Sequence, residues 1–354
     1  LENPLDAAAL REARRGLRLS RELRLPLLTV IDTPGAALSK EAEERGLAGE
    51  IARTLSELLT LPTPTVSLLM GQGAGGIALA LVPADRVLAS EHAWLAPLPP
   101  FSIDRLRPEF TGGDLLIQIA ADDPMSVAHT ARMLLKDARG FAAVHGVQHG
   151  FRQAHGTVAP GTTMRNLFGQ VDGTANPRPG DADFDMVVWS TDGWLAGGTG
   201  MVVRRIRMNL DTWDEVDRGA REFAVGRRLD TGAPLTGGEE HDEPDFAAKD
   251  RLGFPVIYDL AHIRRARSAD PGERIFRRAY NYDVPSTDPD SLSESGLLFI
   301  SFQADVARQF TPMQERLAKA DLLNIWTTPI GSAVFAVPPG CAPDGYIGET
   351  LLDG

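Results

Sequence analysis

The sequence predicts two architectures in one chain, an α/β segment at its start and a longer α+β region after it. In residues 1–98, apolar stretches of strand length alternate with stretches of helical periodicity, which is typical of a parallel sheet with helical crossovers. From residue 99 onward, β-α-β patterns recur between long loops rich in Gly, Pro and Asp. We therefore expect three parts, at 1–98, 99–164 and 165–354.

The composition is that of a globular protein of two or three domains. The chain has 354 residues, of which 43% are hydrophobic and 24% charged. Its formal net charge of -12 argues against nucleic acid or an anionic membrane as a partner. Apolar runs stay shorter than the about 18 residues that a membrane span needs. The composition leaves a homo-oligomer possible.

Cysteine usage and the amino end limit the redox and targeting interpretations. The single cysteine, Cys341, excludes an internal disulfide and a cysteine-rich metal site. Arg14-Arg15 is followed by further charges instead of an apolar stretch, so no signal peptide is visible. We expect an ordinary amphipathic helix there, and a cytoplasmic or an exported location both remain open.

The first part reads as alternating helices and strands. Leu10 and Leu17 have helical spacing, and Ser39 is a plausible helix cap. In order, we expect a helix at 5–22, a buried strand at 26–32, a helix at 39–60, a buried strand at 63–70, an apolar helix after the turn GQGAGG at 71–76, and a strand at 84–90.

The glycine-rich turn at 71–76 would expose backbone N–H groups at a helix start. It lacks the lysine of a phosphate-binding loop and a full dinucleotide fingerprint. An oxyanion hole for a thioester enolate is a second use. Close packing of helix against strand is the purely structural alternative, and composition does not decide among them.

Four stretches of this part resemble the carboxyltransferase component of acetyl-CoA carboxylase: VIDTPGA at 30–36, EAEERGLAGEIARTL at 41–55, GQGAGGIALAL at 71–81 and ADRVLASEHAWLAPLPP at 84–100. The resemblance implies a crotonase-like fold. It makes the backbone amides of Gly35-Ala36 and Gly75-Gly76 candidate oxyanion donors. Because the match stops at Pro100, we expect a partial crotonase-like segment without transferase activity.

Residues 101–164 change in character. After a loop at 101–113, residues 114–123 alternate like a strand, Pro124 opens a helix to about Gly140, and 140–151 reads as another strand. This predicts a β-α-β unit of the ferredoxin-like kind. We expect the apolar face of the helix to point inward: Val127, Ala128, Ala131, Leu134 and Leu135.

The last part combines a long Gly- and Asp-rich loop with further strands and helices. Asp172 lies between Gly169 and Gly173, where flexible backbone can bring a carboxylate close to a flat ligand. After this loop we expect a strand near 199–208, a helix at about 211–225, an acidic loop near 236–250, a buried strand at 296–305, a helix at 311–320 and a final strand at 332–340.

His262 stands at the start of an arginine-rich stretch, 261–282. A neutral imidazole can ligate a metal, and nearby guanidinium groups can bind carboxylates or stabilise a developing negative charge. Taken alone, this stretch is best interpreted as a surface helix with a satisfied histidine. The motif upstream around Asp172 changes that interpretation.

FGQVDGTANP at 168–177, AHIRRAR at 261–267, RRAYNY at 277–282 and GLLFISFQ at 296–303, in this order, resemble the dye-decolourising (DyP-type) peroxidases. The resemblance covers about 99–354. It implies haem b in the C-terminal ferredoxin-like half. It also implies reduction of hydrogen peroxide coupled to oxidation of bulky aromatic reductants.

The resemblance also implies roles for single residues. His262 is expected to ligate the iron, with Asp321 as the candidate partner of its other ring nitrogen, and Asp172 to be the distal acid/base. Arg278 is expected to stabilise the developing charge, with Arg277 the less favoured neighbour. The remaining expectations are a pocket wall from Leu297 and Phe299, and Arg205 or Arg204 beside a haem propionate.

Each family is incomplete at the junction, near Leu98 to Phe101, where both share an LPP-like string. We therefore interpret the chain as a chimera in which the first part of the peroxidase is replaced, leaving a sheet edge and an apolar face exposed. Three functions stay open: a haem peroxidase, an acyl-CoA carboxyltransferase or thioester-binding fragment, and an inactive chimera that only binds haem.

Overall fold

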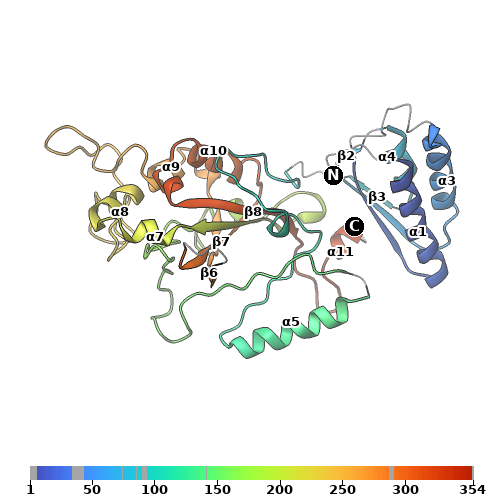
Figure 1. Ribbon diagram of the computed structural model, residues 1–354, viewed down its shortest axis with the longest axis horizontal. Helices are drawn as coiled ribbons and strands as arrows, with labels where there is room; N and C mark the ends of the chain where they lie inside the picture. Colours follow the sequence, from blue (N-terminus) through green and yellow to red (C-terminus); the bar gives the residue numbers. More distant parts are fainter. Residues whose placement is uncertain are drawn as a thin grey trace. The chain divides into compact units, whose positions relative to one another are not determined.

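The structure, a computed structural model, describes residues 6–33, 44–73, 75–84, 86–89, 94–140, 142–286 and 291–352. The chain forms two compact units (Figure 1). One comprises residues 1–96 together with 339–354, and the other comprises residues 97–338.

The first unit contains the predicted parallel sheet, with strand order β1-β2-β3. Its elements are α1 (Ala7–Leu23), β1 (Leu27–Thr33), α3 (Leu47–Leu59), β2 (Thr65–Gly73), α4 (Gly75–Leu81), β3 (Arg86–Ala89) and, near the end of the chain, α11 (Glu349–Leu352). Asp6 caps α1 by accepting hydrogen bonds from the N–H groups of Ala8 and Ala9. The expected helix at 39–60 is shorter in its described part, and its predicted cap, Ser39, lies outside the described residues.

One face of this sheet lacks a cover. Figure 1 shows α1, α3 and α4 together on one side of it. Ile31 is buried, but Leu28 and Val30, which alternate with it along β1, are 54% and 60% exposed. The expectation of a fully buried strand at 26–32 is therefore wrong, because the layer that would cover its second face is missing from the described part of this unit.

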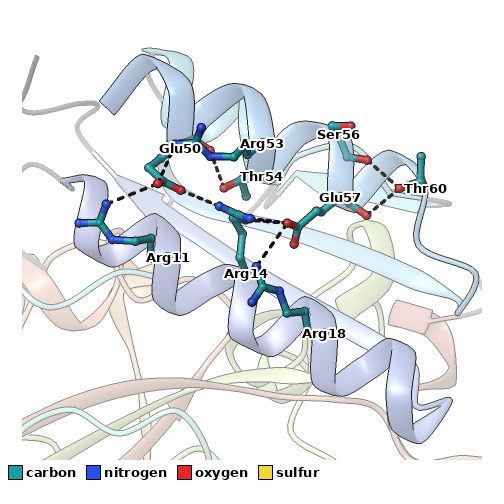
Figure 2. Close-up of polar contacts among 9 residues, drawn as sticks. All are labelled: Arg11, Arg14, Arg18, Glu50, Arg53, Thr54, Ser56, Glu57 and Thr60. Atoms are coloured by element: carbon teal, nitrogen blue, oxygen red, sulfur yellow. Dashed lines mark hydrogen bonds and ion pairs between the residues drawn. The ribbon is translucent and has the colours of Figure 1, made fainter. Parts of the chain in front are cut away.

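An ion-pair network joins the two long helices of this unit, as Figure 2 shows. Arg14 on α1 bonds Glu50 at 2.7 Å and Glu57 at 2.5 Å, both on α3. Arg53 reaches Glu50 at 2.8 Å. The hydrogen bonds from Arg53 and Arg14, together with their charges, lower the pKa of Glu50 to about 2 although burial acts to raise it.

The second unit is built on a five-stranded antiparallel sheet of order β5-β7-β4-β8, with β6 also paired to β7. The strands are β4 (Thr199–Met208), β5 (Phe276–Arg277), β6 (Tyr280–Pro285), β7 (Ser293–Gln303) and β8 (Thr327–Val337). The strands predicted near 199–208, 296–305 and 332–340 are confirmed as β4, β7 and β8, with shifted ends for β7 and β8.

Short helices accompany this sheet: η1 (Pro108–Phe110), α5 (Pro124–Ala138), α6 (Phe184–Val188), η2 (Gly193–Leu195), α7 (Leu210–Asp214), α8 (Arg218–Val225), α9 (His262–Ala266), η3 (Pro271–Glu273), α10 (Phe310–Ala320) and η4 (Leu322–Ile325). The single helix expected at 211–225 is divided into α7 and α8. Asp217 begins α8 by accepting a hydrogen bond from the N–H of Ala220 at 3.0 Å.

The core of the second unit packs the long loop onto the sheet. Its buried members are Met164, Phe168, Met208, Trp213, Val225, Ala279 and Leu297. The ring centroids of Phe168 and Trp213 lie 4.4 Å apart, and the indole N–H of Trp213 donates to the carbonyl of Phe168 at 3.2 Å. The loop that carries Asp172 is thus anchored by apolar residues on both sides of a tight turn.

The β-α-β unit expected at 114–151 does not form. Its helix is present as α5, but it has no buried residue, and Figure 1 shows it apart from the sheet. The described residues of 114–123 and 140–151 form no strand, apart from an isolated bridge between Phe151 and Asn281. Leu134 and Leu135, predicted to point inward, are 39% and 41% exposed. Strands need neighbours to satisfy their backbone, and apart from the Phe151–Asn281 bridge no strand among the described residues pairs with these segments.

None of the helices in the described residues is long and apolar enough to cross a membrane.

Candidate active site

A cavity of about 680 Å³ opens in the second unit, beside Asp172. Its walls come from the loop after residue 160, from the β5–β6 region and from two more distant residues. The lining residues are Arg152, Gly161, Thr162, Thr163, Met164, Asp172, Gly173, Thr174, Asn176, Arg178, His241, Phe276, Arg277, Arg278 and Ala279. Asp172 and Arg278 are the members that the sequence predicted for a site.

Local turn chemistry positions Asp172. The side-chain oxygen of Asn166 accepts hydrogen bonds from the N–H groups of Phe168 and Gln170, which tightens the turn. Gly169 and Gly173 have φ of 77° and 126°, conformations that favour glycine. The backbone N–H of Asp172 donates to the carbonyl of Met164 at 2.8 Å. The glycines on both sides of Asp172 are thus required by the backbone path.

The carboxylate of Asp172 is only 9% exposed and has two partners. Its Oδ1 lies 2.9 Å from Nη2 of Arg277, and its Oδ2 accepts a hydrogen bond from the amide of Asn166 at 3.2 Å. We expected Arg278, not Arg277, beside this carboxylate. Arg278 lines the same cavity, but its Nε donates to the hydroxyl of Tyr280 at 3.2 Å. β5 ends at Arg277, and of the two arginines it is Arg277 whose guanidinium pairs with Asp172.

Asn176 holds the backbone of Arg277 from the loop side. The N–H of Arg278 bonds the carbonyl of Ile300 on β7, so the N–H and carbonyl of Arg277 face away from that strand. The Asn176 side chain fills this edge, accepting from the Arg277 N–H at 2.9 Å and donating to its carbonyl at 2.7 Å. We did not predict this role, although Asn176 stands in the motif at 168–177.

Glu240 was also missed, and it braces the same loop. Its Oε1 accepts hydrogen bonds from the hydroxyls of Thr163 at 2.6 Å and Thr174 at 2.9 Å. Both threonines line the cavity, one on each side of Asp172 in the sequence. A glutamate in an acidic loop carries no sequence signal for such a contact.

His262 begins α9, and its Nδ1 lies 2.6 Å from Oδ2 of Asp321. The predicted pairing of these two residues is therefore confirmed. The other oxygen of Asp321 accepts the N–H of Leu323 at 2.9 Å, which fixes the carboxylate at the start of η4. The bond leaves Nε2 as the ring nitrogen available for a ligand, the arrangement common to metal-binding histidines.

The charges of neighbouring residues, including two that line the cavity, act on the pKa of His262. Burial acts to lower the pKa of His262, but the charge and hydrogen bond of Asp321 outweigh it and the pKa is raised. The positive charge of Arg277 also acts to lower the pKa of His262, and the negative charge of Asp172 acts to raise it. Both charges therefore lie close enough to act on the ring. His262 itself is not among the residues that line the cavity.

Leu297 and Phe299 share one face of β7 but do not line this cavity. Leu297 is buried in the core around Trp213. Phe299 packs on the same cluster, with its ring centroid 5.8 Å from that of Phe310 and 5.9 Å from the guanidinium carbon of Arg277. The two residues form apolar support behind the Arg277 side chain.

The expected propionate partners are already neutralised. Arg205 pairs with Glu294 at 2.7 Å and stacks 3.8 Å from the ring of Phe110. It lies opposite Leu298, on the other face of the sheet from Leu297. Arg204 is on the face of Phe299, but it is buried against the carboxylate of Asp104. Neither arginine lines the cavity, so the geometry does not favour the predicted role for Arg205.

The candidate oxyanion donors predicted from the resemblance to the carboxyltransferase are only partly described by the structure. Gly35-Ala36 lies outside the described residues, and Gly75 is the first residue of α4, a helix of seven residues. The described residues contain no group of three or more His, Cys, Asp or Glu side chains that could hold a metal ion.

Comparison with known families finds the two resemblances in different, partly overlapping parts of the chain. The Dyp-type peroxidase C-terminal domain matches residues 163–342, and its N-terminal domain matches 85–152. The acetyl co-enzyme A carboxylase carboxyltransferase-like family matches residues 6–104. The last two matches overlap at 85–104, the range that contains the predicted junction.

Individual relatives include proteins of both families, and the similarity to one peroxidase extends along nearly the whole chain. The dye-decolorizing peroxidase of Thermobifida fusca is 38% identical over 353 residues, covering 96% of this chain and 80% of that protein. The DyP-type peroxidase of Cellulomonas bogoriensis has a crystal structure that superposes with a TM-score of 0.71 at 57% identity, over 74% of this chain and 73% of that one. The probable biotin-dependent acyl-coenzyme A carboxylase beta3 subunit of Mycobacterium tuberculosis is 69% identical over 93 residues, which are 26% of this chain but 19% of that protein.

Proposed function

The chain belongs to the Dyp-type peroxidase family, and we propose that it is a haem-dependent peroxidase that reduces hydrogen peroxide while oxidising bulky aromatic compounds. The observation that carries the proposal is the hydrogen bond between His262 Nδ1 and Asp321, which orients the ring and increases its basicity. An axial histidine with such a partner is a common ligand of haem iron.

The residues fit haem b. His262 has one ring nitrogen committed to Asp321 and one available, and Asp172 and Arg277 act on it electrostatically. A cavity of about 680 Å³ lies beside this carboxylate, with Phe276, Met164 and Ala279 among its walls. Haem, when bound, supplies the iron that exchanges electrons with peroxide and reductant.

The chain's own residues supply the proton chemistry. Asp172 would accept a proton from one oxygen of hydrogen peroxide and return it to the other, the oxygen that departs, while bound haem would supply the electrons. Arg277, 2.9 Å from Oδ1 of Asp172, holds the carboxylate in place and stabilises the negative charge on the departing oxygen. This assigns to Arg277 the role that we expected for Arg278. Leu297 and Phe299 lie behind the Arg277 side chain and exclude water there.

Titration of the purified chain with haemin tests this function. We expect a saturable Soret band of one haem per chain, lost in His262→Ala and shifted in Asp321→Asn, together with peroxide turnover that falls in Asp172→Asn. His129→Ala is a matched control, since that histidine lies on α5. Haem binding that is equal in all these variants would disprove the role of His262.

The carboxylase-like unit, residues 1–96 with 339–354, corresponds to a small part of its relatives. Its match covers 19% of the mycobacterial relative, and one face of its sheet is uncovered in the described residues. We therefore propose that residues 1–98 are a partial crotonase-like segment without transferase activity.

We further propose that residues 165–354 contain a ferredoxin-like haem domain, supported by the sheet order β6-β7-β4-β8 with α8 and α10 in the two crossovers. On this interpretation, residues 99–164 are the remnant of a first domain. Its exposed apolar helix α5 would favour self-association, which would make the chain a homo-oligomer.

A further inference from the structure

The cavity beside Asp172 has a charge opposite to that of the whole chain. The formal net charge of the protein is -12. Four arginines line the cavity, Arg152, Arg178, Arg277 and Arg278, whereas Asp172 is the one carboxylate among the lining residues. A concave site with an excess of positive charge attracts anions in an otherwise acidic protein.

Among the residues that the structure describes, three of these arginines have no counter-ion. Asp172 neutralises Arg277. Arg278 Nε meets only the neutral hydroxyl of Tyr280, and Arg178 Nη2 meets a ring nitrogen of His241. Within the described ranges, no carboxylate lies within ion-pair distance of the Arg152, Arg178 or Arg278 side chains.

Arg152 is the least satisfied of them. Its Nε is buried and has no hydrogen-bond partner among the described residues. Burial lowers the pKa of Arg152 and the charge of Arg278 lowers it further, whereas the charges of Tyr280 and Asp172 act to raise it. A guanidinium keeps its proton at neutral pH, so a bound anion would offset the cost of burying Arg152.

We propose that Arg152 and Arg278 form a binding site for an oxyanion, a carboxylate or sulfonate, carried by an aromatic ligand that enters this cavity. The planar fork of an arginine matches the two oxygens of such a group. The inference rests on the proposed function only in that it uses the same cavity. Two ligands offer this chemistry, a haem propionate and an acidic aromatic substrate.

The first arm compares haemin with haemin dimethyl ester, in which both propionates are neutral. If the anion is a propionate, Arg152→Gln weakens haemin binding at least about tenfold and leaves binding of the ester unchanged. Arg308→Gln is the matched control, because it removes an exposed arginine outside the cavity.

The second arm uses naphthalene-2-sulfonate and its neutral analogue 2-methylnaphthalene, measured by calorimetry on the full chain without haem. If the anion belongs to a substrate, Arg152→Gln weakens sulfonate binding at least about tenfold and does not change binding of the neutral analogue. Arg152→Lys keeps the charge and retains part of the affinity, which separates loss of the cation from misfolding.

The outcomes separate this site from the proposed function. Failure of the parent chain to bind haemin would reject the haem proposal, while the sulfonate arm would still decide the anion site. If binding of neither haemin nor the sulfonate weakens in Arg152→Gln or in Arg278→Gln, in variants whose circular dichroism matches the parent, the anion site does not exist.

Discussion

The β4 strand and the segment at 114–123 have similar strand-like sequences and opposite outcomes. β4 lies between β7 and β8, and its residues Met201 and Val202 are buried. Residues 114–123 form no strand, and Leu115 and Ile117 are 74% and 52% exposed. An alternating pattern thus specifies which face a strand would bury, whereas neighbouring strands decide whether the strand exists.

The same contrast separates the region that carries the site from the parts around it. Residues 163–337 have a shared apolar core, whereas α5 has no buried residue. The carboxylase-like unit has a small apolar cluster and ion pairs between two helices, and leaves Leu28 and Val30 on one sheet face exposed. Four predictions test this contrast, in order of decreasing effect.

Removing a core ring should destabilise the second unit far more than removing an apolar residue from α5. We expect Trp213→Ala to cost about 3–5 kcal/mol, because Trp213 is 1% exposed and supports the loop that carries Asp172. Leu135→Ala should stay within about 0.5 kcal/mol. Urea unfolding followed by circular dichroism measures both, and equal costs would mean that α5 packs as a structural element.

Replacing Arg277 should impair peroxide reduction more than replacing Arg278. Arg277→Leu removes the cation 2.9 Å from Asp172, and we expect kcat/KM for peroxide to fall about 10²- to 10³-fold. Arg278→Leu should act mainly on the affinity for the aromatic ligand. Steady-state kinetics on haem-loaded variants with unchanged Soret bands tests this order. A larger loss in Arg278→Leu would restore the sequence-based assignment.

Asn176 should act on the reaction through the backbone of Arg277. Asn176→Ala removes two hydrogen bonds to Arg277, and we expect about a tenfold loss of kcat with little change in KM. Asn176→Asp should not rescue it, because a carboxylate oxygen would then face the Arg277 carbonyl. Asn209→Ala, which removes the cap of α7 outside the cavity, is the control. A similar kcat loss there would reveal a general loss of stability.

Acid should destabilise the first unit through Glu50. Its pKa is lowered from 4.5 to about 2 in the folded chain, so its ionised form stabilises the fold. This contribution is complete above the ordinary pKa and is lost as the pH falls from about 4.5 toward 2. Calorimetry between pH 6 and 2 should show a weaker pH dependence of the first unit's melting in Glu50→Gln. An unchanged dependence would assign the effect to other carboxylates.

The sequence by itself determined the identity of the family and the local elements that have neighbours to pack against. The parallel sheet of the first unit, the strands β4, β7 and β8, and the pairing of His262 with Asp321 were all predicted. Helical periodicity and turn chemistry are local properties, and the ordered motifs of a family preserve long-range pairs that a single residue does not reveal.

Only the tertiary structure decided which of the two adjacent arginines, Arg277 or Arg278, pairs with Asp172. The choice of Arg277 over Arg278 depends on how β5 pairs with β7, and the position of Arg205 depends on which face of β4 it occupies. Asn176 meets Arg277 across 101 residues of sequence. Strand pairing sets the direction of every side chain along a strand, and the pairing itself is made by segments far apart in the chain.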